Sequence, residues 1–156
     1  MIVRSANTLE PTGVFVDASD FLRDRLGPIS RDTDIDNSIQ MVNDVLLSYG
    51  ITSLQDAGHA NGMHRWDTLK RLIHSGRLQT RTTMMLSNRS APEFYNAGMQ
   101  FGSGDLFLRL GHVKQMLTAS TGTFLPGLND LIYNIKVAHS MNFPVAIHAV
   151  EEEAIL

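Results

Sequence analysis

The chain has 156 residues, of which 43% are hydrophobic and 19% are charged, and its formal net charge is -3. This composition supports a hydrophobic core, and an acidic chain without a basic stripe is not expected to bind nucleic acid. There is no cysteine, so disulfides and cysteine-based zinc sites are excluded, and metal ligands must be histidine, carboxylate or modified lysine. No apolar run approaches the roughly 20 residues of a membrane span. Residues 1–11 lack the apolar region of a signal peptide, so we expect a cytoplasmic protein without a membrane partner.

Residues 1–49 are expected to form an N-terminal segment with inserted helices. The first eleven residues are polar and irregular, and the Pro-Thr-Gly sequence at 11–13 indicates a turn. Apolar residues then recur at helical spacing over 14–26 and again over 34–49, which predicts two helices. Glycines at 27 and 50 are typical of the positions that end such helices.

Residues 50–156 show alternating strand and helix patterns. Strands are predicted at 51–55, 78–86, 106–117 and 143–150, with Gly111 as a point where the third strand could break. Helices are predicted between them at 65–74, 91–99 and 128–141. The strands begin about every 30 residues, the length of a strand plus a crossover helix, which predicts a parallel sheet with helices outside it.

The architecture of this α/β region has two readings. It is either a small open sheet complete in itself, or strands 2–5 of a TIM-type (β/α)8 barrel, which needs about 250 residues. We favour the partial barrel, because residues 151–156 provide barely one helical turn with no strand after it. The chain would then be a segment of a longer protein or a truncated product.

The last predicted strand carries a single polar side chain, His148. Both faces of 143–150 are otherwise apolar, which is typical of a parallel strand covered on both sides. Glu151 and the two acidic residues after it suit the first turn of a helix. His148 would lie at the carboxyl end of a parallel strand, where ligands and catalytic groups gather. It is either a metal ligand or general base, or a core histidine with both nitrogens hydrogen-bonded.

Lys114 lies on the preceding strand, and alternation places it on the same face as His112 and Met116. A buried lysine should be neutral, paired or covalently modified. Two chemistries fit an uncharged amine: capture of carbon dioxide as a carbamate that bridges two metals, or a Schiff base with a carbonyl substrate. Alternatively, Lys114 extends to the rim of the sheet or pairs with a carboxylate.

Three further residues are candidates for supporting roles. Asp56 ends the first predicted strand of the sheet, and an Asp before Ala-Gly commonly stabilises a turn, so we expect it to support a metal ligand rather than bind metal. Ser120 and Thr121 belong to a polar loop that follows the Lys114 strand. We expect them to contact a substrate at the catalytic face.

Five segments, in order, resemble the amidohydrolase superfamily, and especially the metal-dependent hydrolases grouped with N-substituted formamide deformylases. They are PTGVFVDAS (11–19), GITSLQDAG (50–58), RLGHVKQML (109–117), STG (120–122) and FPVAIHAVEEEAI (143–155). The resemblance implies that Lys114 is the fourth-strand lysine, carboxylated in binuclear members, and that His148 is the fifth-strand metal-binding histidine. It also implies hydrolysis of an amide or related C–N bond in a small molecule, with water activated by one or two divalent metal ions, expected to be zinc.

The sequence also departs from this family. The first-strand His-x-His pair, the sixth-strand histidine and the eighth-strand aspartate have no counterpart here, and Glu151-Glu152 stands where many relatives have Gly-Asp. Since a catalytic zinc usually takes three protein ligands, we expect a hydrolase fragment that is inactive alone, and we assign no catalytic residue within it. Two alternatives remain: a lyase that uses Lys114 for a Schiff base and His148 as proton shuttle, and a non-catalytic half-barrel. Open sheet edges in the latter would favour a homo-oligomer.

Overall fold

The computed structural model describes residues 2–16, 18–27, 32–119 and 122–155. The chain divides into two compact units, Met1–Ile35 and Asp36–Leu156. In the described part of the chain, no helix combines the length and apolar character that crossing a membrane requires.

The N-terminal unit contains two antiparallel strands, β1 (Ile2–Arg4) and β2 (Pro11–Phe15), followed by helix α1 (Ser19–Leu26). The helix expected over 14–26 is therefore wrong in its first part, because Phe15 pairs with Ile2 in a ladder. Alternating β-branched residues favour an extended chain here. The Thr12 hydroxyl adds a cross-strand bond by donating to the Val3 carbonyl oxygen at 3.0 Å.

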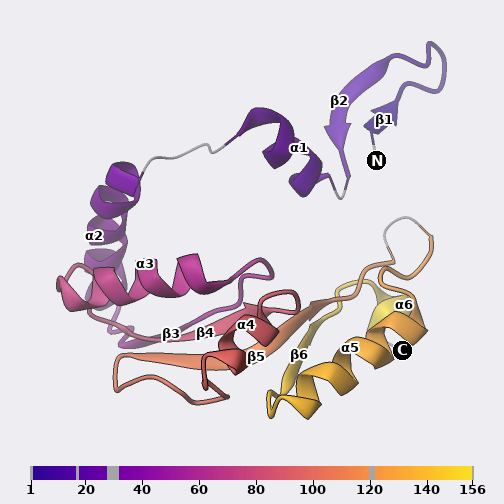
Figure 1. Cartoon of the computed structure of the whole chain (residues 1–156). Helices are drawn as coiled ribbons and strands as arrows, with labels where there is room; N and C mark the ends of the chain where they lie inside the picture. The colour runs from indigo at the N-terminus through magenta and orange to yellow at the C-terminus, as the bar shows by residue number, and fades with distance from the viewer. Residues whose placement is uncertain (1, 17, 28–31, 120–121, 156) are drawn as a thin grey trace. The chain divides into compact units, whose positions relative to one another are not determined.

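The C-terminal unit is built on one four-stranded sheet in the order β3-β4-β5-β6, and each neighbouring pair is parallel. The strands are β3 (Ser53–Asp56), β4 (Arg81–Ser87), β5 (Leu108–Met116) and β6 (Val145–His148). Successive strands are joined by α3 (Met63–His74), α4 (Ala91–Asn96) and α5 (Leu128–Ser140), while α2 (Asp32–Ser48) precedes β3 and α6 (Glu152–Ile155) follows β6. Figure 1 shows the sheet curled as in half of a barrel. The predicted alternation of parallel strands and helices is confirmed.

Helices cover one face of this sheet. Apart from Met85, the buried side chains of the central strands lie on that face: Thr82, Met84, Leu86, Leu108, Leu110, Val113 and Gln115. They meet the buried sides of α3, α4 and α5, and the rings of Trp66 and Phe94 contact edge to face with centroids 6.1 Å apart. On the opposite face, Thr83 and Lys114 are half-buried and His148 is exposed. We call this the uncovered face.

A bulge in β5 changes which side chains reach the uncovered face. Met84 pairs with Leu110, but Leu86 pairs with Val113, so two steps along β4 match three along β5. The strand therefore stays continuous through Gly111 and gains one residue there. Beyond the bulge, Lys114 pairs with Ser87 on β4 and with Ala146 on β6.

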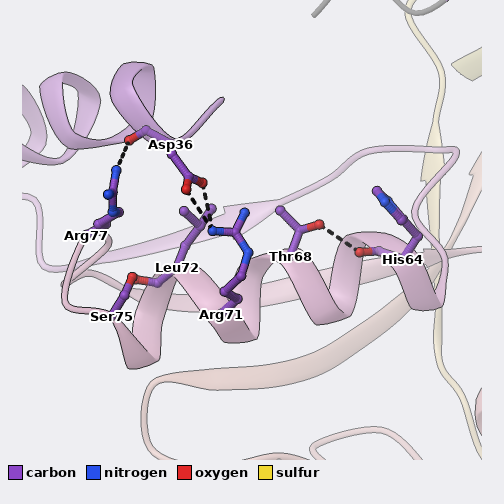
Figure 2. A network of polar contacts seen from close by, with 7 residues as sticks. All are labelled: Asp36, His64, Thr68, Arg71, Leu72, Ser75 and Arg77. Atoms are coloured by element: carbon purple, nitrogen blue, oxygen red, sulfur yellow. Dashed lines mark hydrogen bonds and ion pairs between the residues drawn. The ribbon is translucent and has the colours of Figure 1, made fainter. Parts of the chain in front are cut away.

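Polar contacts attach α2 to α3 and to the segment that leads into β4. The Asp36 carboxylate accepts hydrogen bonds from Arg71 Nη1 at 2.8 and 3.0 Å, and Arg77 Nη1 donates to the Asp36 carbonyl oxygen at 3.0 Å (Figure 2). Asn43 is fully buried, and its Oδ1 accepts the Gln79 N–H at 2.8 Å. A helix whose buried side contains an asparagine is thus held partly by directional bonds.

The expectation that 143–150 forms a strand covered on both sides is wrong. The strand itself is Val145–His148, and although Phe143 before it is 1% exposed, Ile147 is 47% exposed. The physical reason is position, because β6 has only β5 as a neighbour among the described residues. An edge strand leaves part of its surface open.

Candidate functional site

The candidate site lies where the four parallel strands end. Their last residues are Asp56, Ser87, Met116 and His148, and parallel strands bring all their carboxyl ends to the same edge of a sheet. The loops that follow them gather at this edge, which is where α/β proteins commonly bind ligands.

Lys114 and His148 share the uncovered face at this edge. Lys114 pairs with Ala146 and His148 pairs with Met116, so His148 lies on the next strand and two residues further along it. Neighbouring strands are about 4.8 Å apart and two residues span about 6.6 Å, so the two Cα atoms are about 8 Å apart on the diagonal. A long lysine side chain and an imidazole ring can converge on one ligand across such a span.

Lys114 is half-buried and has neutral neighbours in the ladder, Ser87 and Ala146. In the described ranges it makes no hydrogen bond and no ion pair. No carboxylate in the described residues therefore pairs with Lys114, as the ion-pair alternative requires. A partly buried amine without an anion is well placed to receive one, or to be modified.

His148 is the last residue of β6 and is exposed. Its carbonyl oxygen accepts the Leu117 N–H at 2.8 Å, which extends the β5–β6 ladder one step beyond the strands. A core histidine would be buried, whereas His148 is exposed among the described residues. Its imidazole is accessible to a ligand on the uncovered face.

The structure does not bring Asp56 to this pair. Asp56 pairs with the buried Met84 and so lies on the helix-covered face. Its Oδ1 accepts the Gly58 N–H at 3.0 Å, and its Oδ2 lies 3.7 Å from Arg65 Nε. These contacts stabilise the turn that follows β3. The other two expected substrate contacts, Ser120 and Thr121, lie outside the described residues.

A polar network at the ends of β3 and β4 was not predicted. Asn61 is buried, its Nδ2 donates to the Met85 carbonyl oxygen at 3.1 Å, and its own carbonyl accepts from Ser87 N–H at 2.8 Å and Ser90 Oγ at 2.6 Å. The Ser87 and Ser90 hydroxyls are hydrogen-bonded to each other. A Cβ on Gly58 would lie 2.7 Å from Asn61 Oδ1. A glycine two residues after a strand and three residues before an asparagine is the signal that sequence reasoning missed.

A second unpredicted contact joins the loops that leave β5 and β6. The Thr118 hydroxyl donates to Glu151 Oε1 at 2.9 Å. Its own backbone N–H, the Thr118 hydroxyl and the Ala119 N–H hold the pKa of the Glu151 carboxyl below its ordinary range. Glu151 precedes α6 rather than lying in its first turn. Its charge is used to bind donors from two loops.

Lys114 and His148 are suitable metal donors but do not make a complete set. An amine that has captured carbon dioxide supplies oxygen ligands, and imidazole is the commonest nitrogen ligand. Within the described ranges, no three histidine and acidic side chains come together at one point, whereas catalytic zinc takes three protein ligands. The described residues thus fit part of a metal site. A hollow of about 300 Å³ on α2 is lined, among the described residues, by the apolar side chains of Met41, Val42, Val45 and Leu46, which are not metal donors.

Comparisons with known proteins support the fold. No family model matches the sequence and no curated protein matches it. An uncharacterized metal-dependent hydrolase from Pyrococcus furiosus is similar in structure, with a TM-score of 0.67 and 19% identity over 88% of this chain and 32% of that one. Another, from Pyrococcus horikoshii OT3, has a TM-score of 0.69 and 17% identity over 99% of this chain and 35% of that one. The chain therefore has the fold of about a third of these metal-dependent hydrolases.

Proposed function

We propose that this chain is part of a metal-dependent hydrolase of the amidohydrolase kind, in which Lys114 and His148 bind a divalent metal, expected to be zinc. The observation that carries the proposal is their position on neighbouring strands, on one uncovered face, at the carboxyl edge of the sheet. The fold shared with two metal-dependent hydrolases supports the same conclusion. In this proposal β3–β6 are strands 2–5 of a TIM-type (β/α)8 barrel.

Each residue contributes a different donor. Lys114 lies within a nine-residue strand that has a neighbour on each side, so its backbone position is well defined. In its neutral form a lysine amine can attack carbon dioxide, forming a C–N bond and losing one proton, and the anionic carbamate would then offer two oxygens to a metal. His148 offers a ring nitrogen from the next strand.

The reaction that fits this donor set is hydrolysis of an amide or related C–N bond in a small molecule. A divalent metal supplies a water nucleophile at neutral pH. Lys114 and His148 would hold the metal at this edge of the sheet, and the remaining metal ligands would come from other residues. The chain by itself is therefore expected to bind metal weakly and to lack turnover.

Metal binding tests this proposal. Cobalt(II) or zinc titrations would compare the unaltered chain with Lys114→Ala and His148→Ala. The controls, Lys136→Ala and His139→Ala, remove the same side-chain types from exposed positions on α5. We expect affinity to fall by about tenfold or more in the first two variants and to stay unchanged in the controls. Equal behaviour of all five proteins would overturn the proposal.

The runner-up function is Schiff-base chemistry at Lys114, with His148 as a proton shuttle. The lack of any anion beside Lys114 in the described residues favours a free amine nucleophile as well. Borohydride reduction in the presence of a carbonyl compound distinguishes the two functions. A covalent adduct on Lys114 would support the lyase, whereas metal-dependent carbon-13 bicarbonate labelling of Lys114 would support the hydrolase.

A further inference from the structure

The loops that leave β5 and β6 are fastened together directly beyond the proposed ligands. Glu151 follows His148 by three residues, and Thr118 follows Lys114 by four. The Thr118 hydroxyl donates to Glu151 Oε1 at 2.9 Å, so a side-chain bond links the two strand exits. It lies one step beyond the last backbone bond of the ladder, from Leu117 N–H to the His148 carbonyl oxygen.

We infer that Glu151 is a positioning residue, which with Thr118 holds the exit of β6 against the exit of β5 and thereby fixes the His148 ring relative to Lys114. The inference deepens the proposed function and rests on it where metal is concerned. The mechanical part of the inference is that Glu151 and Thr118 hold the C-terminal end of β6 against that of β5. This part rests on the described contacts alone.

The two ligands differ in how much support their strands give them. Lys114 lies in β5, which is paired with β4 on one side and β6 on the other. His148 ends a four-residue strand whose only neighbour in the described ranges is β5, and the Ile147 beside it is 47% exposed. Within the described residues β6 is paired on one side only, and a short strand with one neighbour frays from its ends because few bonds oppose local opening. A bond placed after the last residue of β6 acts where this fraying would begin.

The Glu151 carboxylate is well suited to such a role. Its own backbone N–H, the Thr118 hydroxyl and the Ala119 N–H lower the pKa of the Glu151 carboxyl, which favours the charged form that accepts such bonds. Thr118 is itself anchored, because its N–H and carbonyl pair with Leu125 at 3.0 and 2.9 Å. The Glu151 carboxylate therefore links β6 to the base of the loop after β5, which the two backbone bonds between Thr118 and Leu125 already close.

Amide hydrogen exchange tests the mechanical part. We expect the Leu117 N–H to exchange about tenfold faster in Thr118→Val and Glu151→Ala than in the unaltered chain. The Thr82 N–H, which donates to the Phe107 carbonyl at 2.7 Å near the other end of the sheet, should keep its rate. Glu153→Ala removes an exposed carboxylate nearby and serves as the matched control. Thr118→Ser keeps the hydroxyl and should restore slow exchange.

Metal affinity tests the consequence for the ligands. Cobalt(II) should bind about tenfold more weakly to Thr118→Val and to Glu151→Ala, with no further loss in the double variant, and normally to Glu153→Ala. If His148→Ala leaves affinity unchanged, the proposed function fails, and the exchange result alone decides the positioning role. If His148→Ala weakens binding but neither Thr118→Val nor Glu151→Ala changes the Leu117 exchange rate or the metal affinity, the positioning role is overturned.

Discussion

Gly111 provides the most direct test of how the sheet presents Lys114, and we predict that Gly111→Ala destabilises the protein through Thr83. A Cβ at position 111 would lie 2.9 Å from Thr83 Cγ2 and 3.3 Å from the Met84 carbonyl oxygen. Carbon atoms in contact are normally about 3.5–4.0 Å apart, so the new methyl group overlaps the threonine methyl. The overlap can be relieved only by moving β4 or turning Thr83.

The expected magnitude follows from two opposing effects. Overpacking of this kind costs about 1–3 kcal/mol, while replacing glycine with alanine gains about 0.4–1 kcal/mol by restricting the unfolded chain. The net loss in the free energy of unfolding should be about 1–2 kcal/mol. Thr83→Ser removes the methyl group that is struck, so the same Gly111→Ala change in that background should stay within about 0.5 kcal/mol.

Urea unfolding followed by circular dichroism measures all four proteins of this double-mutant cycle. Midpoints should shift at constant slope, and the coupling between positions 83 and 111 should be about 1 kcal/mol. An equal loss in both backgrounds would show that Thr83 is not the obstacle. No loss in either would refute the argument that the bulge is tightly packed.

Three further predictions concern packing, polar anchoring and pH. Phe143→Ala should lower stability by about 3–5 kcal/mol, since Phe143 is 1% exposed; Tyr133→Ala, at a 67% exposed position, should stay within about 0.5 kcal/mol in the same urea assay. Asn43→Ala leaves the Gln79 N–H without its acceptor and should cost about 1–3 kcal/mol by urea unfolding, a loss that the exposed Asn129→Ala should not reproduce. The N–H groups of Leu108 and then Phe107 lower the pKa of Asp105 in the folded state. Its contribution is therefore present above the unfolded carboxyl pKa, about 3.9, and is lost as pH falls through the folded value. The stability gap to Asp105→Ala should be constant from about pH 7 to 5 and shrink on further acidification, and a gap that persists at the lowest pH would contradict this.

Local patterns were sufficient to predict the sheet of the C-terminal unit. Short apolar strands alternate with helical spacing, and a parallel order of the four strands follows from crossover lengths. The same patterns could not predict β2, because Pro11–Phe15 becomes a strand only by pairing with β1. They also assigned β6 to a covered position from its apolar residues, whereas its exposure depends on which neighbours it has.

The polar part of the candidate site was harder to predict, because it depends on contacts between distant residues. The Asn61 carbonyl accepts from Ser87 and Ser90, which lie 26 and 29 residues further along the chain. Glu151 reaches back 33 residues to Thr118. Nothing local distinguishes these residues from ordinary turn or helix-start residues, which is how Glu151 was interpreted from sequence.

The face occupied by Lys114 depends on a single inserted residue. Leu108 and Leu110 point to the helix-covered face, and strict alternation from them would place position 114 on that face too, away from His148. The bulge between Leu110 and Val113 reverses the alternation, so that Lys114 shares the uncovered face with His148. Alternation counted from Val113 onward predicts the observed face, because the counting then begins beyond the bulge. Any chemistry at this edge of the sheet that uses Lys114 therefore also depends on Gly111, because the bulge at this glycine determines which face Lys114 occupies.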